Sequence, residues 1–198
     1  FGSAGGEPRA NLAALDARSG AVLPWDPRAA GSFHKRAAPW DPRTEGSVVT
    51  LVSDGDVVYA GGSITNMYDW QRRTGLAALD LTTGQVKPWS PEVEGQYLTG
   101  LSVIGNSVYL TGAFSKVNGE PRPNVAAVDA TTGALLPWNR DYVYTLAAYG
   151  DSLYASGSLP VTPGVYQDYV GVLDPNTAAV SGWMAYPDRY AETMLVTD

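Results

Sequence analysis

The sequence predicts an all-β fold built from repeated antiparallel sheets, and three observations carry this prediction. One string of residues returns four times along the 198-residue chain. Each repeat contains four short apolar runs separated by turn signals. No window shows sustained helical periodicity with capping residues. Four strands per repeat at this spacing are typical of a β-propeller blade, so we expect a propeller fragment with three complete blades and partial blades at both ends.

The repeated string sets the length of the unit. Its four copies are LAALDARSGAVLPWDP (12–27), LAALDLTTGQVKPWSP (76–91), VAAVDATTGALLPWNR (125–140) and the more divergent VGVLDPNTAAVSGWMA (170–185). They begin 64, 49 and 45 residues apart, and a second PWDPR motif adds 15 residues to the first interval. The underlying unit is therefore 45–49 residues long, which suits a four-stranded antiparallel blade.

The second repeat shows the four expected strands in order. They are VVTLV (48–52), VVYAGG (57–62), LAALD (76–80) and QVKPW (85–89). The first two are joined by DGD, and the next two repeats have IGN and YGD at this position. Glycine supplies the positive φ that tight hairpin turns need, so each pair is expected to form a hairpin.

The same register extends along the whole chain, which we interpret as one propeller segment (1–198) made of several blades. The chain begins with the third strand of a blade, and ETMLVTD near its end is expected to be the first strand of another. We therefore expect the end of a blade at 1–27, an inserted link at 28–46, blades at 47–91, 92–140 and 141–185, and the start of a further blade at 186–198. The chain starts at Phe1 without a Met, and we interpret it as a piece of a longer protein.

Each copy of the repeat pairs an aspartate with a tryptophan nine residues later. The aspartates are Asp16, Asp80, Asp129 and Asp174, and the tryptophans are Trp25, Trp89, Trp138 and Trp183. We expect each carboxylate to accept backbone N–H bonds in an Asx-type turn, and each indole to fill the seam between neighbouring blades. The fourth turn, NTAA, lacks the glycine of the others and is expected to be looser.

Recurrence favours a structural role for these residues over a role as metal ligands or general acids, because a catalytic group need occur only once. A repeated arginine, Arg9, Arg73 and Arg122, precedes the third strand and is expected to bond a carbonyl or carboxylate. Trp40, in the second PWDPR motif, duplicates Trp25. Which of these two indoles fills the first seam stays open.

The Asp-to-Trp pattern resembles the tryptophan-docking motif of quinoprotein-like propellers, Ala-x-Asp-x-x-Thr-Gly followed by Trp, with one extra proline before the Trp. The stretch FSKVNGEPRPNVAAVD (114–129) resembles bacterial delta-sixty-type repeats, which also form propellers. These resemblances imply a propeller in a bacterial protein that is secreted or held at the cell surface. The familiar quinoproteins carry a vicinal disulfide and a calcium carboxylate set, and this chain matches neither.

The amino-acid composition limits the kinds of catalytic site, metal site and partner that this chain can have. The chain has no cysteine and one histidine, so disulfides, thiolate catalysis and histidine clusters are excluded within it. A net charge of −7 makes nucleic acid an improbable partner. No apolar run approaches the roughly 18 to 20 residues of a membrane span. SDGD (53–56) is interpreted as a hairpin turn rather than a calcium loop, and we predict no cofactor and no metal site.

Candidate binding residues lie in the links that differ between repeats. In a blade, the links from the second to the third strand and from the fourth to the first strand open on one face, and binding residues tend to lie on such loops. Three aromatic residues outside the repeated register are candidates for stacking on a sugar or a partner, or for packing on their own hairpins: Tyr68, Trp70 and Tyr166. The basic cluster of His34, Lys35 and Arg36 is either a further binding element or a solvated insertion.

These observations favour a non-catalytic propeller segment that binds a protein or a glycan through its variable face and contacts the remaining blades of its parent propeller. Two alternatives stay open. The parent could be a quinoprotein-like oxidoreductase or a carbohydrate-active enzyme whose active residues lie outside this chain. The segment could also be a purely structural assembly module.

Overall fold

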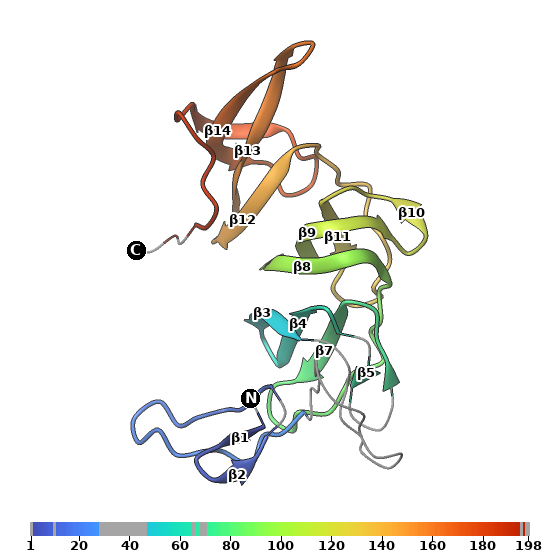
Figure 1. Cartoon of the computed structure of the whole chain (residues 1–198), viewed down its shortest axis with the longest axis vertical. Coiled ribbons are helices and arrows are strands. Elements are labelled where there is room, and N and C mark those ends of the chain that lie inside the picture. The colour runs from blue at the N-terminus through green and yellow to red at the C-terminus, as the bar shows by residue number, and fades with distance from the viewer. Residues whose placement is uncertain are drawn as a thin grey trace. The chain divides into compact units, whose positions relative to one another are not determined.

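The computed structural model describes residues 2–9, 11–27, 47–64, 66–67, 71–194 and 196. The described residues form antiparallel β-sheets and turns and no helix, which confirms the all-β prediction (Figure 1). The chain divides into two compact units, Phe1–Glu92 and Val93–Asp198. Accordingly, no helix long and apolar enough to cross a membrane occurs in the described ranges.

The first unit contains one three-stranded sheet and two small hairpins. The sheet has the order β3-β4-β7, and the hairpins are β1-β2 and β5-β6. The strands are β1 (Ser3–Ala4), β2 (Glu7–Pro8), β3 (Val48–Asp54), β4 (Val57–Gly62), β5 (Asn66–Met67), β6 (Gln71–Arg72) and β7 (Leu76–Asp80).

The second unit contains two larger sheets. In one, β9 pairs with β8, β10 and β11, and in the other the order is β12-β13-β14-β15. The strands are β8 (Val93–Ile104), β9 (Ser107–Val117), β10 (Glu120–Pro121), β11 (Val125–Asp129), β12 (Val143–Tyr149), β13 (Ser152–Thr162), β14 (Val165–Leu173) and β15 (Val180–Ala185).

The same strand order occurs in all three sheets. The first strand pairs with the second across a tight turn, and the second pairs with the third, as in β3-β4-β7 and β12-β13-β14. The predicted turn glycines, Gly55, Gly105 and Gly150, have φ between 52° and 55°. In β7 and β11 the first four residues are all buried, so both faces of the third strand are covered.

The fourth strand differs from the prediction in two of the three sheets. In the second and third repeats it is reduced to a single bridge, Leu79–Val86 or Val128–Leu135. Among the described residues, only the last repeat has a fourth strand with several ladder pairs, β15. Proline explains the difference, because Pro88 and Pro137 have no N–H to donate to a sheet ladder, whereas Gly182 occupies this position in β15.

Two terminal strands were also predicted wrongly. LAALD at 12–16 forms only the bridge Leu15–Val22, because no described second strand pairs with it. In ETMLVTD, the described residues 192–194 and 196 are not in a strand. In the described residues of these two segments, no regular strand is present.

Each unit has a buried cluster among its described residues. In the first unit, Leu12 and Trp25 of the first repeat pack against the β3-β4-β7 sheet of the second repeat. In the second unit, side chains of β9 and β11 pack with side chains of β12, β13 and β14. In both units the apolar core therefore lies between two consecutive repeats.

Candidate functional site

The repeated aspartates form the same turn in all four copies. One Oδ1 atom of each accepts the backbone N–H groups two and three residues later and the hydroxyl three residues later. In Asp129 these distances are 3.0, 2.6 and 2.8 Å. The predicted Asx-type arrangement is thus present. The hydrogen bonds lower the pKa of all four carboxyls, for Asp129 chiefly through the backbone N–H of Thr132.

The fourth turn is not looser, contrary to the prediction. The N–H of Thr177 lies 2.7 Å from the Asp174 carboxylate, within the range of the other copies. Ala178 takes the left-handed conformation at φ 62°, where the other copies have glycine. Left-handed backbone is strained for alanine. Burial of its methyl group in the core and a hydrogen bond from Arg140 to its carbonyl hold Ala178 there.

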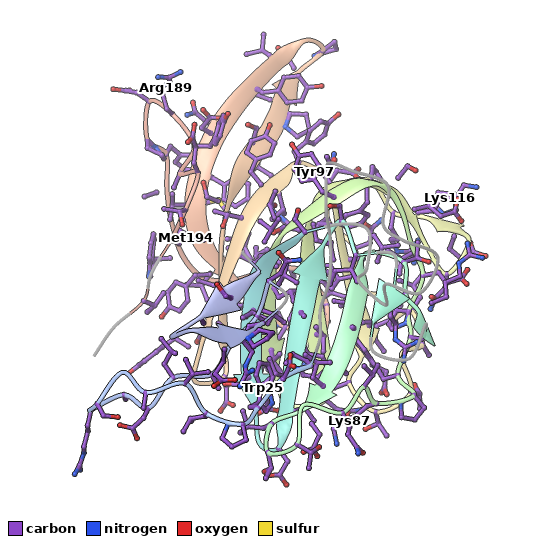
Figure 2. All side chains as sticks on the ribbon, turned by 60° about the horizontal axis from the view of Figure 1, so that its bottom comes forward. Trp25, Lys87, Tyr97, Lys116, Arg189 and Met194 are labelled. Carbon is purple, nitrogen blue, oxygen red and sulfur yellow. The ribbon has the colours of Figure 1, made fainter. Side chains whose placement is uncertain are left out.

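Two of the repeated indoles hydrogen-bond across to the next repeat. Trp25, which is labelled in Figure 2, donates its Nε1 proton to the backbone carbonyl of Asp80 at 3.1 Å. Trp138 Nε1 donates to the carbonyl of Asp174 at 3.2 Å. The ring of Trp138 also meets Tyr109 edge-on, with centroids 5.2 Å apart. The Asx turn of one repeat therefore presents the carbonyl that receives the indole of the repeat before it.

Trp183 does not follow this pattern. Its side chain is 55% exposed, whereas Trp138 is 2% exposed and Trp89 is also buried. In the described residues no strand follows β15 and covers this ring. That Trp183 fills a seam with a further blade stays a prediction. Trp40, the alternative to Trp25 for the first seam, lies outside the described residues.

The repeated arginines bond backbone carbonyls, one of the two roles expected for them. Arg73 is buried and donates to the carbonyls of Arg72 and Lys87, both at 2.8 Å. Burial lowers the pKa of Arg73. Arg9 makes the equivalent pair of bonds to Pro8 and Leu23. These forks link the start of the third strand to the proline-containing segment that cannot pair as a strand.

Of the six predicted binding residues, only Tyr166 lies in the described part of the chain. Tyr68, Trp70, His34, Lys35 and Arg36 fall outside the described residues. Tyr166 lies on a paired hairpin and not on a loop, because β13 and β14 stay paired up to Thr162 and Val165 (Figure 1).

Tyr166 belongs to a cluster of four exposed tyrosines, which we call the tyrosine patch: Tyr142, Tyr144, Tyr166 and Tyr190. The rings of Tyr142 and Tyr166 lie 5.0 Å apart, and their hydroxyls are 3.3 Å apart. This hydrogen bond raises the pKa of Tyr142, and the nearby Tyr144 adds to the shift. The rings of Tyr144 and Tyr190 form a second tilted pair at 4.5 Å.

A polar network lies beneath the patch and holds the hydroxyl of Tyr144 and the backbone of Tyr190. The Tyr144 hydroxyl lies 3.1 Å from Ser158 Oγ, and Ser158 donates to Asp168 Oδ1. The other oxygen of Asp168 accepts the backbone N–H of Tyr190 at 3.0 Å. The buried hydroxyl of Ser156 accepts the next N–H, that of Ala191, at 2.8 Å. These bonds attach the segment after β15 to the sheet.

Two backbone irregularities orient the tyrosines at the start of β12. Tyr144 is the extra residue of a β-bulge between Val143 and Thr145. Tyr142 precedes the strand with φ 59°, an uncommon value for a bulky residue. The same bulge occurs in the first strands of the other two sheets, where Val49 and Thr99 occupy it. Bulges re-aim side chains, and here the bulge leaves the Tyr144 ring partly exposed while one side of it contacts Tyr190.

Sequence reasoning missed Tyr142, Tyr144 and Tyr190. The signal was available at Tyr144, because the aligned positions hold Val49 and Thr99. Within the described ranges, no group of three or more His, Asp or Glu side chains could hold a metal ion. No protein-family model matches this chain, and no match to it is found among the curated proteins.

Proposed function

We propose that the chain is a segment of a β-propeller and acts as a non-catalytic binding module of a secreted or cell-surface protein. The tyrosine patch is its contact surface, and a glycan is its partner. The propeller arrangement is supported by two seams of the same design, in which the carbonyls of Asp80 and Asp174 each receive the indole of the preceding repeat. The remaining blades of the parent propeller would continue this stacking.

The tyrosine patch is the observation that carries the binding role. Four aromatic side chains, each 39–49% exposed, gather on the β12-β13-β14 sheet and the segment after it. Tyrosine offers an apolar ring and a polar hydroxyl, and it loses little conformational entropy when it binds. Hydrogen bonds hold the hydroxyl of Tyr144 on Ser158 and join the hydroxyls of Tyr142 and Tyr166 before binding, which reduces the ordering cost of association.

The surroundings of the patch favour a glycan over a protein. A sugar ring presents a C–H face that stacks on an aromatic ring and hydroxyls that need hydrogen-bond partners. Asp141 supplies such a partner at the edge of the patch, because it precedes Tyr142 in the chain and its charge acts on the Tyr142 hydroxyl. The centre of a protein interface is instead depleted of charged groups.

A glycan array with the purified chain tests this proposal. We expect Tyr166→Ala to weaken binding of any glycan hit by about tenfold or more, as for an aromatic residue at the centre of an interface. Tyr149→Ala is the matched control, because Tyr149 is similarly exposed at the far end of β12 and outside the patch. An array without hits, or equal losses in the two variants, would contradict the proposal.

A further inference from the structure

We propose that the binding surface continues from the tyrosine patch onto the preceding repeat through Tyr97 of β8, and that its glycan is a neutral, unbranched oligosaccharide that lies across two repeats. This inference rests on the proposed function of the patch and adds a second contact to it. Tyr97, which Figure 2 labels, is an exposed tyrosine outside the patch and lies in the same compact unit.

Tyr97 and Tyr142 occupy the same position in two consecutive repeats. The backbone carbonyl of Tyr97 lies against Gly112 of β9, and that of Tyr142 lies against Gly157 of β13. A Cβ added to either glycine would collide with the carbonyl, so both second strands allow the same close approach of the first strand. The two side chains are also similarly exposed, at 46% and 40%.

The fold does not require a tyrosine at this position. In the second repeat Ser47 stands there, and its carbonyl lies against Gly62 in the same way. The residue opposite Tyr97 on β9 is Ala113, whose methyl group is too small to cover a tyrosine ring. Folding of the sheet therefore leaves the Tyr97 ring accessible, and its contribution is to the surface.

The two tyrosines lie on neighbouring first strands. The Ser102 hydroxyl of β8 donates to the Leu146 carbonyl of β12 at 3.3 Å, which joins these strands. Packed sheets are about 10 Å apart, so a ligand that reaches both Tyr97 and Tyr142 must be longer than one sugar ring.

An unbranched oligosaccharide fits this arrangement because it presents successive C–H faces along its length. One sugar can stack on the tyrosine patch and another on Tyr97, so the two contacts reinforce each other. Asp141 at the edge of the patch and the net charge of −7 disfavour acidic sugars, which makes a neutral chain the expected class.

Isothermal titration calorimetry with short and long sugars tests the inference. The probes are cellobiose, maltose and chitobiose, each compared with its hexasaccharide. We expect at least one hexasaccharide to bind about tenfold or more tightly than its disaccharide, because it gains the Tyr97 contact. In Tyr97→Ser this gain should disappear, while the affinity for the disaccharide stays that of the parent chain.

Tyr149→Ser is the matched control, because Tyr149 is a similarly exposed tyrosine at the far end of β12 and its loss should leave the gain intact. An unchanged affinity of Tyr97→Ser for the disaccharide also shows that this variant is folded.

Two results would overturn the inference. In one, the gain with length persists in Tyr97→Ser. In the other, no hexasaccharide binds more tightly than its disaccharide, or none of these sugars binds. Either result leaves the proposed function standing if Tyr166→Ala still weakens binding of a glycan found on the array, whereas an array without hits would remove both.

Discussion

Replacing Trp138 by alanine removes a buried contact between two repeats. The ring is 2% exposed, meets Tyr109 edge-on and donates to the Asp174 carbonyl. A buried indole removes about 200 Å² from water, which corresponds to about 5 kcal/mol at about 25 cal/mol per Å². The Asp174 carbonyl keeps the N–H of Ala178, so no acceptor is left without a donor. We therefore expect a loss of about 3–5 kcal/mol in the free energy of unfolding.

Trp183→Ala is the matched control, because it removes the same side chain from the same repeat position. Since Trp183 is 55% exposed, less than half of the apolar area is at stake and the expected loss is about 1–2 kcal/mol. Trp138→Phe keeps a ring but deletes the donor, and should cost about 1–2 kcal/mol. Equilibrium urea unfolding followed by far-UV circular dichroism measures all three at constant m-value. Equal losses for the two alanine variants would refute the docking account.

Three further predictions concern the turns and the arginine fork. Gly20→Ala should destabilise the protein by about 1–2 kcal/mol, because alanine is strained in the left-handed conformation. Gly84→Ala should destabilise it more, because an added Cβ would also lie 3.2 Å from a backbone nitrogen. A lower thermal unfolding midpoint for Gly20→Ala than for Gly84→Ala would contradict this. The N–H of Thr132 lowers the pKa of Asp129 in the folded state. The stability that this provides is complete above the ordinary pKa of 3.8 and is lost as pH falls through the lower folded pKa. Asp129→Asn should therefore make the free energy of unfolding less dependent on pH in the acid range. In Arg73→Lys, the lysine cannot donate to both carbonyls as the guanidinium does, so the free energy of unfolding in urea should fall by about 1–3 kcal/mol. An unchanged urea midpoint would contradict this.

The repeated pattern correctly predicted the second and third strands of the second repeat. VVYAGG and LAALD of the second repeat match β4 and β7 residue for residue, because their apolar pattern and flanking turns both point to strands. The fourth strand failed at Pro88, where local chemistry overrides the period. The signal was present in the sequence, since only the last repeat replaces this proline, with Gly182.

The tyrosine patch could be predicted only in part. Tyr166 was found because it departs from the repeat register. Tyr190 could not be found, because its position depends on a hydrogen bond to Asp168 from a segment that was expected to lead into another blade. Ala178 shows the same limit, since packing holds a left-handed conformation that the sequence alone disfavours.

Hydrogen exchange of the indole N–H groups, followed by NMR with assignments from single Trp→Phe variants, tests the docking of repeats most directly. The account predicts slow exchange for Trp25 and Trp138, whose N–H groups are bonded to a carbonyl of the next repeat. At low protein concentration Trp183 should exchange at the rate of a free indole, since its ring is exposed. Fast exchange at Trp138, or equal protection of all three, would contradict the account.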